Sequence, residues 1–449
     1  MEQRLAALDT DKAVVATRIG DVQAEFDAAP GKVIEASYHT PYLVHATMEP
    51  VVATVHVRDG EIEVWGPIQG QDMVRWTMAK NFDVPADKVI VHTTFLGGSY
   101  GRKYVPDFVL HAAVASKAVG RPVKVIRSRE DDIRHGYYRP CASARFRAVL
   151  GKDGYPVAMH ARVVGESLYA MIKPKAMAAA GGWDETMLDS IYDLAYAVPN
   201  LTVDNLDVKQ PIPVSFMRSV GSTSAVFFLE SFINELADAA GIDPYQYRRR
   251  MLSHDPHAIA VLDRVAEASG WNKPPRKGIY RGLAFNLYTG RGGAFKTYVA
   301  HVVEVEIVKG APAVRRVVCA RRRRNDHQPR AGEGQHRGRH RLCPDQYPQK
   351  RNNFCEWGRR AEQFSRLSAA WPLRDAEYRG CSDRERSAAA RLRRGVSGAG
   401  RSRGRTCHLS RNQGALEVDA VQAANELDAG TGDIASTSTI RRSIVLAIG

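Results

Sequence analysis

The alternation of hydrophobic and polar residues predicts a series of short strands and helices. β-Branched runs of period two indicate strands, and apolar residues three and four positions apart indicate helices. Residues 1–30 are polar and helix-prone. The predicted strands are 32–38, 51–57, 61–65, 88–92, 121–126, 142–150, 156–165, 301–308 and 314–320, with 88–92 expected to be buried, and the predicted helices are 73–80, 107–119, 225–240 and 244–252.

These elements mix without a regular strand–helix–strand alternation, which favours an α+β fold with mixed sheets and packed helices. At 449 residues the chain can hold two or three domains. We predict an N-terminal remnant (1–30), a main region (31–320) that can divide into two subdomains near 145–215, and a tail (321–449) that is irregular or disordered.

The charge is concentrated in the tail. Residues 321–410 hold 22 arginines and one lysine against 9 acidic residues, and so carry +14 of the net charge of +15. The rest of the chain is nearly neutral, which argues against a nucleic-acid-binding body. Cys141 and Cys319 are the cysteines before this tract, too few for a disulfide framework, so a reducing compartment is expected.

No apolar run is long enough to span a bilayer, and the sequence begins without a signal-peptide pattern. We therefore expect a cytoplasmic protein without a membrane span. A periplasmic location is expected instead if a longer natural N-terminus carries an export signal.

The apolar periodicity stops at Arg321, and lysine almost vanishes beyond Lys309. Arginine-rich sequence without lysine is typical of GC-rich DNA translated out of frame. Residues 321–329 can be encoded so that a reading frame one nucleotide later gives V-D-A-G-T-T-I-N-P, a protein-like string. We interpret the tail as the product of a frameshift near Ala320.

The alternative interpretation makes residues 321–410 the functional part of a non-enzymatic basic protein that binds nucleic acid. His336, His340, Cys343 and Cys355 also have loose zinc-site spacing. Both functions need a fold or interleaved aromatic residues that this tract does not supply.

The stretch Phe95-Leu-Gly-Gly-Ser-Tyr-Gly-Arg-Lys103 lies between a predicted strand and a predicted helix. Its three glycines let the backbone approach a ligand, and exposed amides at such a turn suit an oxyanion or a phosphate. The stretch lacks the Lys-Ser/Thr ending of a P-loop and the G-x-G-x-x-G spacing of a dinucleotide fold. An ordinary structural turn therefore remains an alternative on this pattern alone.

Several motifs in a fixed order resemble the molybdopterin-binding subunit of the xanthine dehydrogenase/aldehyde oxidase family, in particular the isoquinoline 1-oxidoreductase beta subunits. The resemblance covers about residues 20–320. The motifs are His45-x-x-x-Glu49-Pro50, Val64-Trp65-x-x-x-Gln69, Leu96-Gly-Gly-Ser-Tyr-Gly-Arg102, Pro122-Val-Lys-Val, Ser128-Arg-Glu-Asp-Asp132, Tyr138-Arg-Pro140, Arg218-Ser-Val-Gly221 and Glu230-Ser-Phe-x-x-Glu235-Leu-Ala.

The resemblance implies a molybdopterin with molybdenum, expected in the cytosine dinucleotide form, and a partner small subunit that carries iron–sulfur clusters. It implies hydroxylation of an N-heteroaromatic compound or an aldehyde with water as the oxygen source. It implies no protein ligand to the metal. We expect no nucleic-acid partner, because the basic tract lacks the fold or the interleaved aromatic residues that such binding needs. The implied cofactor-binding residues are Gln69, Gly97, Gly98, Ser99, Tyr100, Gly101, Arg218, Ser219 and Gly221.

Ser99 replaces a usual glycine of the family turn, and a positive φ at this residue would strain it. Gln69 matches a family glutamine that donates to the oxo group of the metal, although a loop amide bonded to the backbone is an alternative. An exposed arginine at a turn is the alternative for Arg218. We interpret His45 and Glu49 as a bonded structural pair and not as metal ligands.

No residue of the sequence as translated matches the catalytic residue of the family. The family's catalytic glutamate appears only in the shifted reading frame, where its codon would straddle Arg394 and Gly395. General bases contribute roughly 10²–10⁴ in rate. We therefore expect a fragment of a molybdenum hydroxylase large subunit that is inactive as written.

Overall fold

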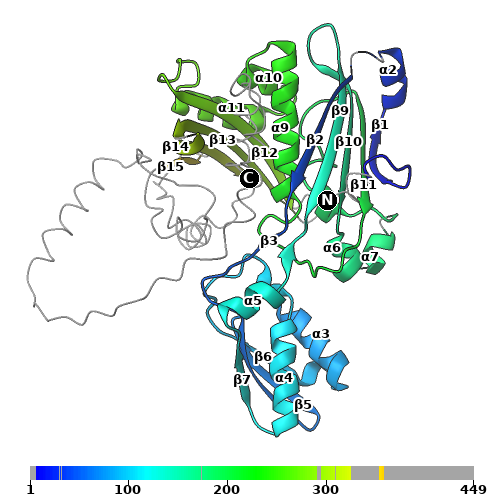
Figure 1. The fold of residues 1–449 in the computed structure, drawn as a ribbon, viewed down its shortest axis with the longest axis vertical. Coiled ribbons are helices and arrows are strands. Elements are labelled where there is room, and N and C mark those ends of the chain that lie inside the picture. The colour runs from blue at the N-terminus through cyan, green and yellow to red at the C-terminus, as the bar shows by residue number, and fades with distance from the viewer. Residues whose placement is uncertain are drawn as a thin grey trace, which may run out of the picture. The chain divides into compact units, whose positions relative to one another are not determined.

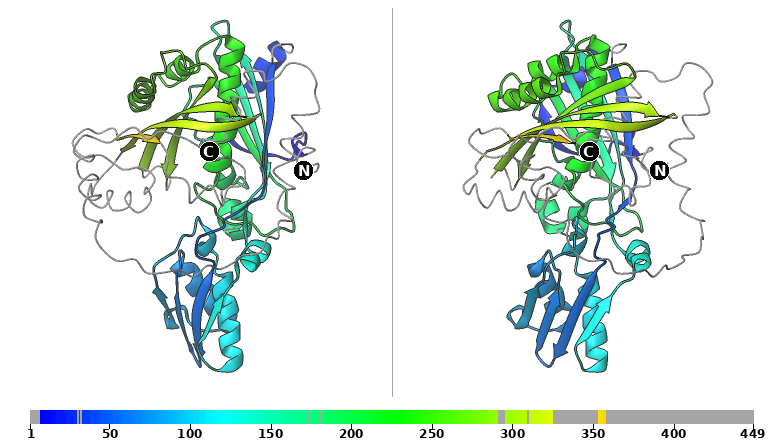
Figure 2. Two further views of the ribbon diagram at one scale, coloured as in Figure 1. Left: turned by 60° about the vertical axis from the view of Figure 1, so that its left-hand side comes forward. Right: turned by 90° about the vertical axis from the view of Figure 1, so that its left-hand side faces the viewer.

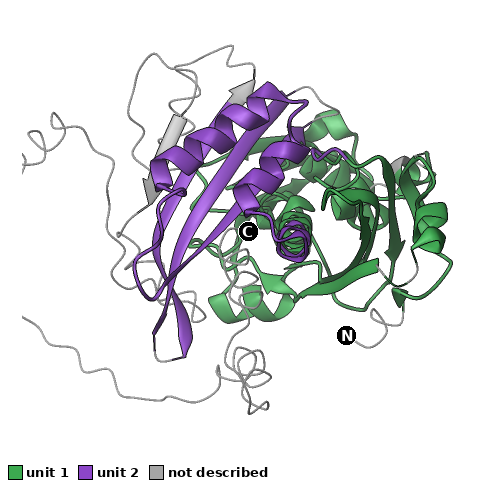
Figure 3. Ribbon diagram, turned by 90° about the horizontal axis from the view of Figure 1, so that it is seen from above, with its two compact units in different colours: residues 1–194, 198–232 green, residues 195–197, 233–449 purple. Residues whose placement is uncertain are grey.

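The computed structural model describes residues 7–29, 31, 33–172, 174–179, 181–290, 295–308, 310–324 and 353–357. The chain divides into two compact units, which Figure 3 colours separately. Unit 1 consists of Met1–Leu194 and Val198–Phe232, and unit 2 of Ala195–Ala197 and Ile233–Gly449. Each unit combines sheets with helices, so the predicted α+β class is confirmed.

A five-stranded mixed sheet forms one part of unit 1. β9 and β10 are the predicted long hairpin, and β10 pairs parallel to β11. The strands follow the order β1 (Val14–Ile19), β11 (Asn200–Asp207), β10 (Pro156–Gly165), β9 (Ala142–Leu150) and β2 (Val33–Thr40). Tyr38 on β2 stacks on Phe228, which anchors the start of α9 (Ser222–Ala240) to this sheet.

A four-stranded sheet with two helices forms the other part of unit 1 (Figure 1). Its order is β6 (Val89–Thr93), β5 (Glu61–Gly66), β4 (Val52–Arg58) and β7 (Val123–Ile126). α3 (Gln71–Phe82) and α4 (Asp107–Val119) pack their apolar faces on this sheet. Burial of these faces is the main stabilising term for such a layer. The fully buried side chains include Val55, Val64, Val74, Met78 and Phe108.

Unit 1 also contains several short elements. β3 (Leu43–Val44) pairs with β8 (Tyr138–Arg139) in a two-stranded sheet. The others are α2 (Val22–Ala28), η1 (Ala86–Lys88), η2 (Arg102–Tyr104), α5 (Arg129–His135), α6 (Leu168–Ile172), α7 (Pro174–Ala179) and α8 (Glu185–Leu188).

Unit 2 contains the end of α9, two further helices and a second four-stranded sheet. The helices are α10 (Pro244–Met251) and α11 (Pro256–Ser269). The sheet has the order β12 (Ile279–Gly290), β13 (Phe295–Val308), β14 (Ala311–Arg324) and β15 (Asn353–Trp357). α11 packs on β13 and β14 (Figure 2).

Two sequence predictions about single elements are wrong. Residues 14–19, expected to be helix-prone, form β1, because their β-branched side chains suit pairing with β11. Residues 89–93 are not a buried strand: β6 is an edge strand, and Val89 is its one buried residue.

The described part of β14 continues four residues beyond Ala320 to Arg324, paired with β13. Apart from residues 321–324 and 353–357, the tail for which irregular structure and a frameshift are predicted lies outside the described residues.

Candidate functional site

The glycine-rich turn follows β6 and enters η2 with an unusual backbone. Gly98, Tyr100 and Gly101 have φ angles of +98°, +52° and +105°. Glycine adopts such angles at little cost, whereas Tyr100 is strained there. Ser99 is not in this region, so the serine that replaces a usual glycine does not need a positive φ.

Glu49 fixes the first glycine of the turn. Its carboxylate accepts the Gly97 N–H at 3.0 Å, and its backbone N–H donates to the Gly97 carbonyl at 2.9 Å. The same carboxylate pairs with the buried ammonium of Lys103. Burial acts in the opposite direction, but the hydrogen bonds from Lys103 and Gly97 hold the pKa of Glu49 below its ordinary value. A Cβ at Gly97 would lie 2.5 Å from the Glu49 Cβ, so glycine is required.

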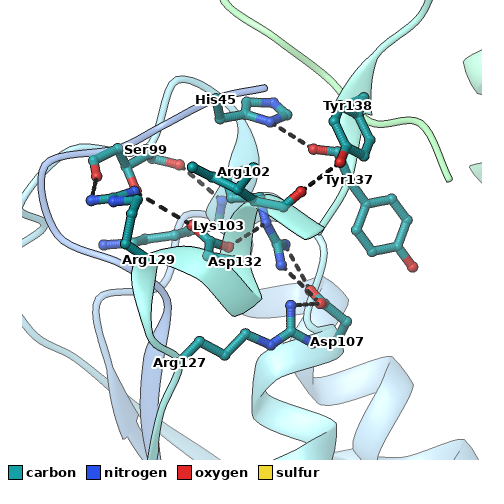
Figure 4. A network of polar contacts seen from close by, with 12 residues as sticks. His45, Ser99, Arg102, Lys103, Asp107, Arg127, Arg129, Asp132, Tyr137 and Tyr138 are labelled. Carbon is teal, nitrogen blue, oxygen red and sulfur yellow. Dashed lines mark hydrogen bonds and ion pairs between the residues drawn. The ribbon is translucent and has the colours of Figure 1, made fainter. Parts of the chain in front are cut away.

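Arg102 fixes the end of the turn (Figure 4). Its side chain is 1% exposed and binds Asp107 through two bonds, of 2.8 Å from Nη1 and 2.9 Å from Nη2. Its Nε donates to Asp132 at 3.2 Å, and Arg127 reaches Asp107 at 3.1 Å. Bidentate pairs of this kind fix direction as well as distance. The network therefore holds the exit of the turn rigidly against α4 and α5.

The segment that carries Arg218 meets the turn at Phe216. A Cβ at Gly101 would lie 2.0 Å from the Phe216 carbonyl oxygen, so only glycine allows this approach. The Arg218 N–H donates to the Tyr100 carbonyl at 2.9 Å. The rings of Tyr104 and Phe216 meet edge-to-face with centroids 5.1 Å apart. The backbone of Arg218 is thus brought to the turn, as the sequence predicts for a shared site.

His45 is buried between two backbone carbonyls, and Figure 4 shows it beside that of Tyr137. Its Nδ1 lies 3.1 Å from the Tyr137 oxygen and its Nε2 lies 2.8 Å from the Phe216 oxygen. Burial lowers the pKa of His45, although both carbonyls act in the opposite direction. The predicted pair of His45 with Glu49 is wrong, because each residue bonds to other partners and both fix the backbone around the turn.

Gln69 follows β5 and presents an exposed side chain beside the turn. Its backbone N–H donates to the Lys103 carbonyl at 3.1 Å, and its Oε1 accepts the Ser99 hydroxyl at 2.5 Å. No described residue accepts a hydrogen bond from Gln69 Nε2. The donor end of the carboxamide is therefore available to a ligand.

A second strained turn follows Arg218. Ser219 and Val220 have φ angles of +64° and +49°, which are costly for residues other than glycine. A Cβ at Gly221 would lie 2.3 Å from the Thr186 carbonyl oxygen, so the chain packs backbone to backbone here.

Asp189 holds the far end of this second turn by accepting the Gly221 N–H. Burial raises the pKa of Asp189 to about 7, and repulsion from Glu185 and Asp193 adds to the rise. The carboxyl group is thus poised to change charge near neutral pH.

Unpaired donors gather around the two turns. Within the described part of the chain, the backbone N–H groups of Gly98, Ser99 and Tyr100 have no acceptor. Gln69 Nε2 and the exposed Arg218 side chain add further donors. A run of free amides with a guanidinium suits an acceptor-rich anionic ligand. The sequence-predicted residues are thus brought together in unit 1.

Sequence reasoning did not find Phe216 or Asp189 as parts of this site. Phe216 acts through its carbonyl oxygen, which carries no sequence signal. Asp189 is one acid among several between β10 and β11. Their roles depend on contacts between segments far apart in the chain.

Other predicted features lie outside the described residues: the codon position of the family glutamate across Arg394 and Gly395, and the loose zinc spacing of His336, His340 and Cys343. In the described ranges, no three metal-binding side chains of His, Cys, Asp or Glu form a group that could hold an ion. No helix in these ranges combines the length and apolarity needed to cross a membrane.

The family profile described as the molybdopterin cofactor-binding domain matches residues 7–252. The chain is 29% identical over 314 residues to the isoquinoline 1-oxidoreductase subunit beta of Brevundimonas diminuta, covering 67% of this chain and 39% of that protein. It is 32% identical over 236 residues to an aldehyde oxidoreductase molybdenum-binding subunit of Escherichia coli K12, covering 51% of this chain and 30% of that protein. The chain therefore spans about two fifths or less of these relatives.

The fold is also similar to that of solved structures. The aldehyde oxidoreductase of Desulfovibrio desulfuricans superposes with a TM-score of 0.53 at 17% identity, covering 68% of this chain and 35% of that one. At this identity the likeness supports the fold alone.

Proposed function

Because the chain belongs to the family of molybdopterin cofactor-binding domains, we propose that its glycine-rich turn, Gln69 and Arg218 bind a molybdopterin within a molybdenum-dependent oxidoreductase. The family membership inferred from the motifs is confirmed by the profile match over residues 7–252. The observation that carries the proposal is the convergence of Gln69, the turn and Arg218 through the Gly101–Phe216 contact.

The residues present fit such a group. Molybdopterin offers a phosphate and several ring acceptors, and the site offers the free amides of Gly98, Ser99 and Tyr100. The Cβ-free position at Gly98 has no atom closer than 3.7 Å, so the backbone there can be approached closely by a ligand. Arg218 would pair with anionic oxygen, and Gln69 Nε2 would donate to an oxygen near the metal. Ser219 and Gly221 would shape the turn that presents Arg218.

When bound, the cofactor would supply a metal that accepts two electrons from the substrate while oxygen derived from water enters the product. The side chains described here would orient that group and would not exchange protons with the substrate. Turnover also needs a general base, which the family resemblance assigns to a glutamate whose codon would straddle Arg394 and Gly395. We therefore propose that the chain as written binds cofactor but does not turn over.

We further propose an aldehyde or an N-heteroaromatic compound as substrate, because the relatives named above act on both classes. The cytosine dinucleotide form of the cofactor and a small subunit with iron–sulfur clusters complete the proposal. Each follows from the family resemblance and not from a contact in unit 1 or unit 2.

The test measures cofactor retention by the full chain, produced in a host that makes molybdopterin. Molybdenum is counted by mass spectrometry, and pterin by the fluorescence of its oxidised form. We expect both in the wild-type protein. Arg218→Ala should reduce retention at least about tenfold, the effect of one charge-assisted bond, and Gln69→Ala should reduce it less.

Arg134→Ala on the exposed side of α5 and Gln246→Ala on α10 are matched controls, because both side chains are exposed and distant in sequence from the turns. They should retain wild-type levels. Wild-type protein that folds but holds neither molybdenum nor pterin would contradict the proposal.

A further inference from the structure

Ser99 lies at the centre of a three-way hydrogen-bonded junction. Its Oγ accepts the Lys103 backbone N–H at 3.0 Å and donates to Gln69 Oε1 at 2.5 Å. The Gln69 N–H donates to the Lys103 carbonyl at 3.1 Å. Gln69 is therefore fixed to the turn by both its main chain and its side chain.

The hydroxyl has one hydrogen, and this decides how the carboxamide is oriented. The Lys103 N–H occupies a lone pair of Ser99 Oγ, so the hydroxyl hydrogen needs an acceptor. Gln69 Oε1 is the acceptor within reach. If the carboxamide were turned over, Nε2 would face Ser99 and the hydroxyl hydrogen would lose this acceptor in a residue only 9% exposed.

The anchor of this junction is itself rigid. Lys103 is 1% exposed, and its ammonium pairs with Glu49, which also holds Gly97. The next residue toward the N-terminus, Arg102, is fixed by Asp107 and Asp132. Ser99 thus connects an exposed side chain to a segment that is held by buried ion pairs.

We propose that Ser99 is a positioning residue that holds the Gln69 carboxamide with its Nε2 donor turned away from the turn and toward the ligand. The inference rests on the proposed function only in naming the ligand as molybdopterin. A glycine or an alanine at this position would leave the carboxamide free to turn over, and its donor would be directed only part of the time.

The first experiment examines the orientation without any cofactor. The full chain is labelled with ¹³C and ¹⁵N in glutamine, and the Gln69 carboxamide signal is identified by its loss in Gln69→Ala. In Ser99→Ala, the Gln69 carbonyl ¹³C signal should move upfield because it loses its donor, whereas Ser99→Thr should preserve the wild-type position. Ser37→Ala, at an exposed serine of β2, is the control and should leave the signal unchanged.

If Ser99→Ala does not fold, Ser99→Cys keeps a weaker donor of similar size and should give a smaller shift in the same direction. An unchanged Gln69 signal in a folded Ser99→Ala or Ser99→Cys variant would overturn the inference.

The second experiment asks whether Ser99 acts through Gln69. Molybdenum and pterin per chain are measured for Ser99→Ala, Gln69→Ala and the double variant. One lost hydrogen bond predicts about a fivefold decrease for Ser99→Ala. The double variant should retain no less than Gln69→Ala alone, because the two side chains act as one unit.

If the losses of cofactor retention in Ser99→Ala and Gln69→Ala multiplied in the double variant, the two side chains would act independently. That result would overturn the positioning role of Ser99. If the wild-type protein held no cofactor but the Gln69 signal moved as expected in Ser99→Ala, the proposed function would be contradicted. The positioning role of Ser99 would still be supported. The two failures are therefore distinguishable.

Discussion

The two turns that meet at Phe216 are held in different ways. The glycine-rich turn is fixed by charge, since Lys103 pairs with Glu49 and Arg102 pairs with Asp107 and Asp132 in a buried setting. The turn after Arg218 is fixed by close backbone packing at Gly221 and by Asp189, whose charged neighbours are acids. The first turn thus needs its groups ionised, whereas the second is more stable when Asp189 is neutral. Neutralising a charge should therefore have opposite effects in the two regions.

The largest expected effect is at Arg102. Arg102→Met leaves Asp132 buried without this partner and removes both bonds to Asp107. Breaking a buried ion pair from one side costs about 3–5 kcal/mol of the free energy of unfolding. Urea unfolding at pH 7 measures this loss.

Arg134→Met, at an exposed arginine of α5, is the matched control and should change stability by less than about 0.5 kcal/mol. If both variants lost equally little, the first turn would not be held by charge and the comparison would fail.

Asp189→Asn should act in the opposite direction. Burial raises the pKa of Asp189 to about 7 in the folded chain, above its ordinary value of 3.8, so the folded state keeps a proton that the unfolded state releases. The contribution of Asp189 to the free energy of unfolding therefore falls as pH rises from about 4 to about 7, and the asparagine variant lacks this fall. The stability gained by Asp189→Asn should grow across this window, on the order of 2 kcal/mol by pH 8.

Thermal unfolding between pH 4 and pH 8 measures how the stability of the wild type and of Asp189→Asn changes with pH. Asp59→Asn, at an exposed aspartate in the turn between β4 and β5, should run parallel to the wild type. An Asp189→Asn profile that is also parallel to the wild type would remove the distinction between the two turns.

The smallest effect concerns backbone strain in the second turn. Ser219 is exposed and has a φ of +64°, so Ser219→Gly should relieve strain and stabilise the chain by about 0.5 kcal/mol. Ser37→Gly, at an exposed serine with ordinary strand geometry in β2, should destabilise it by a similar amount. Differential scanning calorimetry measures both changes, and loss of stability in both variants would show that Ser219 carries no strain.

Elements with long periodic patterns and clear end signals could be predicted from the sequence. Residues 107–119 match α4, which ends at Gly120 with a φ of +65°, and the 142–165 hairpin matches β9 and β10. β1 could not be predicted from the sequence, because residues 14–19 form a strand through their pairing with β11. α11 was not predicted, although Asp255, Pro256 and Gly270 carry its start and end signals.

The candidate site also contains some residues that could be predicted from the sequence and others that could not. Gln69, the glycine-rich turn and Arg218 could be named from motifs, because their residue types carry the chemistry. The Phe216 carbonyl and the raised pKa of Asp189 could not, since each arises from contacts between distant segments. The role of Ser99 was also hidden, because it depends on the direction of one hydroxyl hydrogen.

The carbonyl of Phe216 touches Gly101 on one side and His45 on the other. During synthesis on the ribosome, the glycine-rich turn and its ion pairs emerge first and can form early. The contacts of the Phe216 carbonyl with Gly101 and His45 can form only after Phe216 has left the exit tunnel. Nascent chains stalled before that point should therefore keep the glycine-rich turn accessible to proteases, and release of a few more residues should protect it.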